Sequence, residues 1–233
     1  MDILKKTVRS NHGEIELSIP RDREAKSVSY RYGRGSMVLK DLTMTFDAGK
    51  VHALLGVSGA GKTTLLSLLA GLDYCDDGQI LFDGADLRKM NRDVYRARNV
   101  GMVFQQFNLL HRWNALENVV MAMEISKYKT PDNKAYASEL LESLGIDEGK
   151  RRRKVIELSG GEQQRVAIAR ALSHKPKIVL ADEPTGSLDE SNQNGIIESL
   201  VKSAHEDGRC IVISTHSRDV AAMADEVFEI ERL

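Results

Sequence analysis

The stretch that decides the fold is Gly56-Val57-Ser58-Gly59-Ala60-Gly61-Lys62-Thr63, which has the spacing G-x-x-x-x-G-K-[ST] of a phosphate-binding loop. The apolar residues Val51, Ala53, Leu54 and Leu55 before it are typical of a buried strand. Residues 64–70 after it predict a buried helix that ends at Gly71. Strand, glycine-rich loop and helix are the context in which this motif binds phosphate. An ordinary glycine-rich turn is the alternative, and it is disfavoured because every motif position is filled.

Each part of the loop has a physical reason. Glycines let successive backbone N–H groups converge on a polyphosphate where a Cβ would clash, and the positive end of the following helix adds to the field. Lys62 is placed to reach the β- and γ-phosphates, and the Thr63 hydroxyl is placed to bind Mg²⁺. The sequence therefore predicts a site for a polyphosphate with its metal ion.

The composition is that of an ordinary globular protein. The chain has 233 residues, 42% hydrophobic and 29% charged, which suits one domain or two closely packed lobes. Its formal charge of −1 gives no general attraction to nucleic acid. It has no apolar run of about 20 residues and no signal peptide, so we expect a cytoplasmic location. Cys75 and Cys210 lack metal-ligand spacing and are expected to be reduced.

The residues before the loop are typical of β structure. Alternating apolar residues at 28–32 and 37–46, joined by turns, predict an antiparallel β layer. Residues 1–24 are mostly polar, and we interpret them as a leader. Within it, the alternation at residues 14–19 predicts a short edge strand that ends at Pro20.

The residues after the loop alternate between strands and helices. Apolar runs at residues 79–82, 100–104, 178–181 and 210–214 predict strands, and helices are expected near residues 166–172 and 191–204. Residues 114–149 have helical periodicity and indicate a helical subdomain inserted at about residues 106–165. The pattern predicts an α/β fold with a parallel sheet, in which ligands gather at the carboxyl ends of the strands.

Polar side chains follow these strands. Each could have a functional role, and each also has a structural explanation. Asp182 and Glu183 end an apolar run before Pro184, which favours a metal ligand and a general base over a helix cap. Gln105 suits a Mg²⁺ site but could be a surface amide. His216 follows a buried strand, although a lone histidine is usually structural.

A further candidate precedes the helix at residues 166–172. Ser159-Gly160-Gly161 would form an exposed helix N-terminus, which could be a plain cap or an anion site. The residues alone leave both possibilities open.

Together these motifs resemble the ATP-binding-cassette ATPases over roughly residues 25–230. The phosphate loop, Gln105, Asp182-Glu183, Ser187-Leu188-Asp189 and His216 occur in the order of that family. The diagnostic element is Leu158-Ser159-Gly160-Gly161-Glu162-Gln163, because phosphate loops also occur in unrelated enzymes. The resemblance implies an α/β P-loop NTPase core, with the antiparallel layer and the helical subdomain, in a nucleotide-binding domain at residues 25–233.

The resemblance also implies roles for individual residues. Tyr32 would stack on adenine, although only its register favours it over Tyr30. Thr63 and Gln105 would bind Mg²⁺, and Asp182 would hold the metal through water. Glu183 would be the general base, with His216 on the γ-phosphate and the attacking water. The residues around ATP would be Gly56, Val57, Ser58, Gly59, Ala60, Gly61, Lys62, Thr63 and Thr64 of one subunit, and Ser159, Gly160, Gly161 and Glu162 of the other, with Asp189 at the dimer contact.

Within the family, the chain resembles the branch that drives lipoprotein release, macrolide export and antimicrobial-peptide resistance. This implies a head-to-tail homodimer that forms with ATP and works with a separate membrane permease, on the cytoplasmic face of the membrane. We expect the permease to dock on an exposed run at residues 107–113. The alternative for this run is that Leu109 and Leu110 pack under the helical subdomain. The alternative is a soluble cassette that acts on nucleic acid or ribosomes. It is disfavoured because the chain lacks heptads, a cysteine cluster and a basic footprint.

Three features depart from the family pattern: Ser217 after His216 and Cys75 after Tyr74, neither of which carries chemistry, and a basic run. Residues 150–154 are five consecutive basic residues just before the signature. We interpret them as a solvated face, and the alternative is contact with anionic lipid headgroups or with an acidic loop of a partner.

Overall fold

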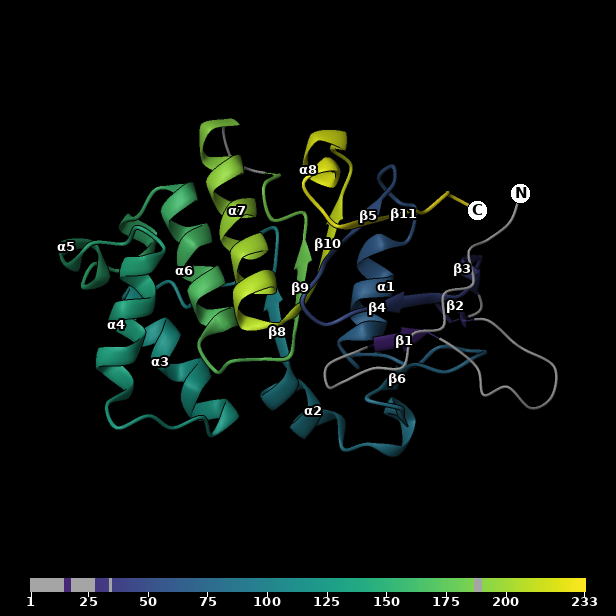
Figure 1. Cartoon of the computed structure of the whole chain (residues 1–233), viewed down its shortest axis with the longest axis horizontal. Helices are drawn as coiled ribbons and strands as arrows, with labels where there is room; N and C mark the ends of the chain where they lie inside the picture. Colours follow the sequence, from purple (N-terminus) through teal and green to yellow (C-terminus); the bar gives the residue numbers. More distant parts are fainter. Residues whose placement is uncertain (1–14, 18–27, 34, 187–189) are drawn as a thin grey trace.

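The structure, a computed structural model, describes residues 15–17, 28–33, 35–186 and 190–233. At its centre lies a parallel sheet in the order β11-β5-β10-β9-β8 (Figure 1). The strands are β5 (Val51–Leu55), β8 (Val100–Val103), β9 (Ile178–Asp182), β10 (Cys210–Thr215) and β11 (Glu226–Glu229). The parallel sheet is as predicted, except that β11 was not expected, because at the edge of the sheet it has only two apolar residues.

Helices cover both faces of this sheet. Leu180 and Val212 pack with α1 on one face, and Val179 and Ile211 pack with α6 and α7 on the other. Side chains alternate along a strand, so a sheet covered on both faces has the continuous apolar runs seen in the sequence. The helices are α1 (Lys62–Leu69), α2 (Arg92–Asn99), α3 (Ala115–Ser126), α4 (Asn133–Ser143), α5 (Glu148–Arg151), α6 (Gly160–Leu172), α7 (Glu190–Asp207) and α8 (Arg218–Ala222).

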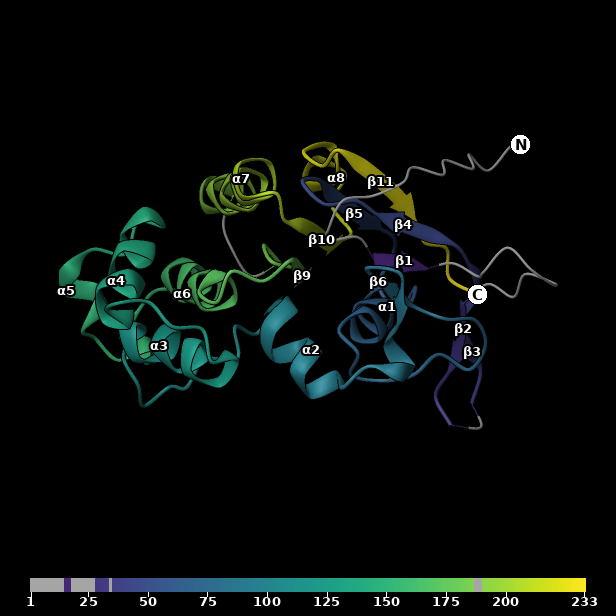
Figure 2. The ribbon, with the colours of Figure 1, turned by 60° about the horizontal axis from the view of Figure 1, so that its bottom comes forward.

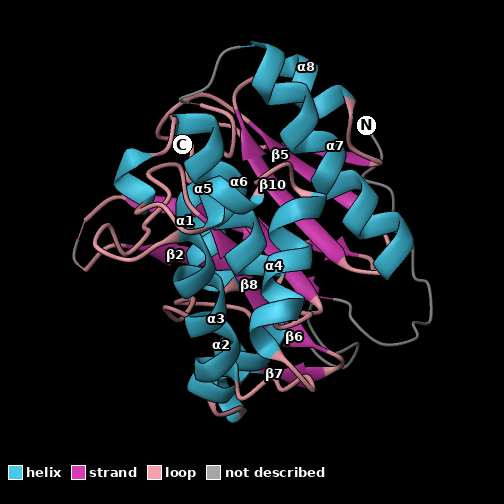
Figure 3. Cartoon of the chain, turned by 90° about the vertical axis from the view of Figure 1, so that its left-hand side faces the viewer, coloured by secondary structure: helices cyan, strands magenta, loops and turns pink. Residues whose placement is uncertain are grey.

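The predicted helical region forms a lobe at one end of the molecule, built from α3, α4, α5 and α6 (Figures 1 and 2). Figure 3 shows these helices in front of the central sheet. Val119, Met123 and Leu141 are completely buried in a separate core of the lobe. The Asn114 side chain accepts the Glu117 N–H and begins α3 with a capping box. The lobe therefore has its own core while sharing α6 with the sheet.

Two small antiparallel sheets form the predicted β layer. One has the order β4-β1-β6-β7 and the other pairs β2 with β3. Their strands are β1 (Ile15–Leu17), β2 (Val28–Arg31), β3 (Met37–Leu42), β4 (Met44–Phe46), β6 (Leu81–Phe82) and β7 (Ala85–Asp86). The prediction that β1 is an edge strand was wrong, because it pairs with β4 on one side and β6 on the other. Alternation reveals a strand but not its neighbours.

Two helices of the core, α2 and α8, were not predicted. α2 begins at Asn91, whose side chain accepts the N–H groups of Asp93 and Val94. Its only buried residue is Tyr95, which is 1% exposed and donates its hydroxyl to the Leu69 carbonyl at the end of α1. A single large aromatic residue holds this helix, so its sequence gave no periodic signal.

Two surface predictions need correction. Leu109, expected in an exposed run, is 6% exposed and packs in the core of the lobe, whereas Leu110 and Trp113 are each 41% exposed. Arg151, expected on a solvated face, is 8% exposed and donates to the Ile146 carbonyl. Leu109 is wholly apolar and joins the core of the lobe. Arg151 instead buries its apolar stem while its guanidinium donates to a carbonyl, which a composition argument overlooks.

Candidate nucleotide site

The phosphate loop connects the carboxyl end of β5 to α1, as the motif predicts. Gly61 has φ +96° and directly precedes the helix, and a Cβ there would lie 2.7 Å from a Leu39 methyl carbon. A Cβ on Gly56 would lie 2.4 Å from the Ile230 carbonyl oxygen. The first turn of α1 carries no acidic residue and no side-chain cap. Its N–H groups are therefore available to an anion, and the loop fits a polyphosphate.

Lys62 is folded back across this loop. Its ammonium donates to the carbonyls of Gly56, at 2.8 Å, and Val57, at 3.2 Å, and lies 3.4 Å from the Glu183 carboxylate. The residue is only 6% exposed. A buried cation held mainly by carbonyl groups can exchange them for phosphate oxygens, which offer a full charge.

Thr63 and Asp182 meet beside the loop. The Thr63 hydroxyl donates to Asp182 Oδ1 at 3.1 Å, and the Ser214 hydroxyl donates to the same oxygen at 2.6 Å. Among the described residues no partner is recorded for Oδ2. A hydroxyl and a carboxylate at this distance are the oxygen ligands that Mg²⁺ prefers, so these two residues fit a magnesium ion.

Glu183 adopts an uncommon backbone conformation, with φ +45°. Its N–H donates to both the carbonyl and the hydroxyl of Ser214. Its carboxylate lies 3.4 Å from the Lys62 ammonium and 3.0 Å from His216 Nδ1. The left-handed backbone turns this side chain away from the strand and between two nitrogen donors.

Gln105 follows β8, the neighbour of β9 in the sheet. The residue is exposed, and a Cβ built on Gly186 would lie 3.2 Å from its Nε2. Its amide therefore lies against the segment that follows Asp182 and Glu183. The structure records no direct contact between Gln105 and Asp182 or Thr63 in the part of the chain that it describes.

The structure separates the two candidate tyrosines. Tyr30 is 5% exposed and donates its hydroxyl to Asp73, and this hydrogen bond raises the pKa of Tyr30 to about 12. Tyr32 is 58% exposed, and its hydroxyl lies 3.0 Å from that of Thr64 at the start of α1. Only Tyr32 therefore presents a free aromatic face beside the loop.

The signature residues lie at the N-terminus of α6. The Ser159 side chain accepts the Glu162 N–H, and the Glu162 carboxylate accepts the Ser159 N–H, which lowers the pKa of Glu162. Gly160 is exposed and Gly161 is buried. Figures 1 and 2 place α6 and α1 on opposite sides of β9, so the signature is remote from the loop of its own chain. Asp189 lies outside the described residues.

Sequence reasoning missed Ser214. It is completely buried in β10 and touches both Asp182 and Glu183. The signal was available, because this serine directly follows the apolar run Cys210-Ile211-Val212-Ile213.

Comparison with known proteins agrees with this geometry. The profile of a family described as ABC transporter matches residues 39–186. The lipoprotein-releasing system ATP-binding protein LolD 2 of Chlorobium chlorochromatii is 42% identical over 215 residues, which cover 89% of each chain. This chain belongs to the ABC transporter family.

Two other relatives define the extent of the match. YclH of Bacillus subtilis, an uncharacterized ABC transporter ATP-binding protein, is 40% identical over 89% of this chain and 92% of its own length. The macrolide export ATP-binding/permease protein MacB of Mannheimia succiniciproducens is 37% identical, but the match covers only 33% of that protein. The predicted resemblance to this branch of ABC transporter ATPases is confirmed.

Solved structures agree with the predicted fold class. The dimeric structure of MJ0796, described as a bacterial ABC transporter cassette, is 33% identical and has a TM-score of 0.81, covering 93% of this chain and 94% of that chain. A second dimeric structure of MJ0796, in a post-hydrolysis state bound to ADP and Pi, also has a TM-score of 0.81. The present chain is an ABC cassette that binds and hydrolyses ATP as the nucleotide-binding subunit of a transporter. Across the described residues, none of its helices is both long and apolar enough to cross a membrane.

Proposed function

We propose that this cassette works as an ATP-dependent homodimer on the cytoplasmic face of the membrane, where it drives a separate permease. The observation that carries the proposal is the convergence of Lys62, Glu183 and His216 at the carboxyl ends of β5, β9 and β10. These strands come from distant parts of the chain, and only the parallel sheet brings their ends together.

Each residue of this cluster has a role in hydrolysis. Lys62 binds the phosphates, and Thr63, Asp182 and Gln105 hold Mg²⁺, which neutralises phosphate charge when bound. Glu183 accepts a proton from the attacking water, and its contacts with Lys62 and His216 hold the carboxylate in place. Tyr32 supplies the surface on which adenine stacks.

The signature supports head-to-tail pairing. Ser159 and Gly160 are exposed and Gly161 is buried at the N-terminus of α6, which is remote from the phosphate loop of the same chain. In a head-to-tail dimer this N-terminus faces the γ-phosphate of the ATP held by the other subunit, so two ATP molecules become part of the interface. ATP then favours the dimer by mass action.

The permease docks on the segment that follows Gln105. Phe107 and Asn108 have positive φ angles, and their carbonyls accept hydrogen bonds from Arg170 of the signature helix. Leu110 and Trp113 remain exposed beside them. A partner that moves this segment therefore pulls directly on α6, which carries the signature. An apolar patch with a polar rim is a usual docking surface.

Cysteine cross-linking in native membranes tests this arrangement. Cysteines at Asn108 or Arg112 should cross-link to a cytoplasmic segment of a membrane protein, and a cysteine at Lys202, exposed on α7, is the matched control. The ATPase activity of the isolated chain should be low and should rise when the permease is present. Cross-links to soluble or RNA-bound factors alone, with turnover indifferent to membrane, would favour the soluble-cassette alternative.

A further inference from the structure

The completely buried hydroxyl of Ser214 occupies a position where the sheet otherwise has apolar side chains. Ser214 pairs in register with Leu54 on β5 and Asp182 on β9. Two residues earlier on the same face, Val212 and Leu180 pack against α1. Burial of a hydroxyl is unfavourable unless it forms hydrogen bonds, so this serine needs partners.

Both partners of the hydroxyl belong to the hydrolytic site. It donates to Asp182 Oδ1 at 2.6 Å and accepts the Glu183 N–H at 3.1 Å. A serine hydroxyl has one proton to donate, and here the carboxylate takes it. The donor to Oδ1 fixes the rotation of the Asp182 carboxylate, which leaves Oδ2 directed elsewhere.

The second contact bears on the backbone of Glu183. A left-handed conformation is unfavourable in a residue other than glycine, so φ +45° at Glu183 requires local support. The hydroxyl and the carbonyl of Ser214 share the Glu183 N–H. Without the hydroxyl, only the longer bond to the carbonyl, at 3.2 Å, would hold this peptide group.

From these contacts we infer that Ser214 is a positioning residue, which aligns Asp182 for the metal and Glu183 for the water with one hydroxyl. The inference rests on the roles proposed above for Asp182 and Glu183. Ser214 is completely buried, and its hydroxyl is engaged by Asp182 and Glu183, so we expect it to act through these two residues. Its effect should therefore appear in metal dependence and turnover, and not in metal-free binding of ATP.

The test compares three substitutions. Ser214→Ala removes the hydroxyl, Ser214→Cys keeps nearly the same volume with a weak donor, and Ser214→Thr keeps the hydroxyl. Loss of a hydrogen bond to a charged group lowers an equilibrium constant or a rate by about 10- to 100-fold. We expect Ser214→Ala and Ser214→Cys to lower turnover by this factor, and Ser214→Thr to restore most of it.

A binding measurement separates positioning from general damage. The affinity for ATP is measured by calorimetry in the presence of Mg²⁺ and in the presence of EDTA. The ratio of the two affinities is the metal gain, the increase in ATP affinity that Mg²⁺ provides. Ser214→Ala should reduce this gain about tenfold or more and leave the affinity in EDTA unchanged. Ser173→Ala is the matched control, because Ser173 is equally buried but its hydroxyl donates to the Arg170 carbonyl.

Several outcomes overturn the inference. One is Ser214→Ala with normal turnover and a normal metal gain; another is an equal loss of ATP affinity with and without Mg²⁺, which would indicate a structural role. Asp182→Asn distinguishes failure of the inference from failure of the proposed site. If Asp182→Asn loses both readouts while Ser214→Ala loses neither, only the inference fails. If Asp182→Asn, like Ser214→Ala, keeps normal turnover and a normal metal gain, the assignment of the metal site fails.

Discussion

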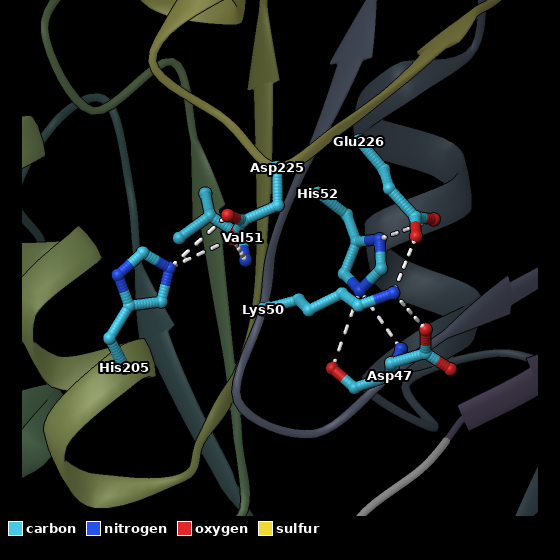
Figure 4. A network of polar contacts seen from close by, with 7 residues as sticks. All are labelled: Asp47, Lys50, Val51, His52, His205, Asp225 and Glu226. Carbon is cyan, nitrogen blue, oxygen red and sulfur yellow. Dashed lines mark hydrogen bonds and ion pairs between the residues drawn. The ribbon is translucent and has the colours of Figure 1, made fainter.

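Strand β5 has a lysine near each end, and the two lysines have opposite surroundings. Lys50, just before the strand, donates to the carboxylates of Asp47 at 2.6 Å and Glu226 at 2.7 Å. Lys62, just after the loop, donates to two backbone carbonyls and has one carboxylate at 3.4 Å. Figure 4 shows the network at the amino end.

Charges at the amino end satisfy one another. The Asp47 and Glu226 carboxylates raise the pKa of Lys50 above its ordinary value. Burial alone would raise the pKa of the Asp225 carboxyl. The carboxylate accepts hydrogen bonds from the Val51 N–H and the His205 imidazole, and these outweigh burial and lower the pKa. At the carboxyl end, Lys62 is held mainly by backbone carbonyls, and the first turn of α1 has no side-chain cap. A network closed on itself holds strands together, whereas an open one can bind a ligand.

The largest expected effect is at the carboxyl end. Glu183→Gln keeps the shape and hydrogen bonding of the side chain but removes the base, so turnover should fall about 10²- to 10⁴-fold. ATP should still bind, and the melting temperature should be almost unchanged. Phosphate release and calorimetry measure the two properties. Unchanged turnover would move the base elsewhere, with His216 the next candidate.

Lys62→Ala should have the opposite effect, because it should weaken the binding of ATP. The ammonium is the only formal side-chain charge that the loop brings to the phosphates, so ATP affinity should fall about 10- to 100-fold. Calorimetry at physiological salt measures this. Near-native affinity would contradict the assignment of the loop.

The nucleotide site at the carboxyl end of β5 should also require a second chain. Because Glu183→Gln traps ATP, it should elute as a monomer without nucleotide and as a dimer with Mg-ATP. Adding Ser159→Arg should abolish that dimer, since a bulky cation would fill the signature N-terminus, while ATP binding to the monomer persists. Size-exclusion chromatography reads the outcome. A dimer that forms without ATP, or that survives Ser159→Arg, would count against the head-to-tail arrangement.

At the amino end we expect an effect on stability and none on catalysis. Lys50→Met removes the centre of the network, but Lys50 and Glu226 are each 40% exposed at the side chain, so water screens the loss. The free energy of unfolding should fall by about 0.5–1 kcal/mol, and the melting temperature by about 1–4 °C. Turnover measured well below the melting temperature should not change. A loss of turnover would mean that the two ends of β5 are coupled.

The smallest effect concerns His52, which is completely buried between Phe46 and Phe228. Burial lowers the pKa of His52, although Glu226, with its carboxylate 3.5 Å from Nδ1, opposes this. The unfolded chain binds a proton at the ordinary value of about 6.5, and the folded chain binds it only at lower pH. The free energy of unfolding should therefore decrease as pH falls below about 6.5.

His52→Gln is the matched control for this pH dependence. A glutamine can accept the Asp47 N–H, as His52 Nε2 does, but it does not titrate. The free energy of unfolding of this variant should decrease less than that of the wild type as pH falls from 7 to below about 6.5. Urea unfolding at several pH values measures this decrease. Equal slopes in the two proteins would show that the Glu226 carboxylate compensates for protonation of His52.

The sequence could predict most of the fold and of the site because both depend on local patterns. A loop between a strand and a helix needs glycines at fixed positions, and Lys62 and Thr63 follow directly from that geometry. Asp182, Glu183 and His216 became candidates because each stands at the end of a buried strand. By contrast, β11 and α2 have too few apolar residues to show a period, and the pairing of β1 on both sides depends on strands distant in the sequence.

By itself, the sequence determined the family, the parallel α/β core and the residue types at the site, since these follow from short-range chemistry and spacing. The tertiary structure decided which tyrosine is free, that Leu109 and Arg151 are buried, and that Ser214 joins Asp182 to Glu183. Those facts depend on contacts across neighbouring strands and between lobes. Register in the sheet places Ser214 beside Asp182, and no local pattern in the chain specifies that register.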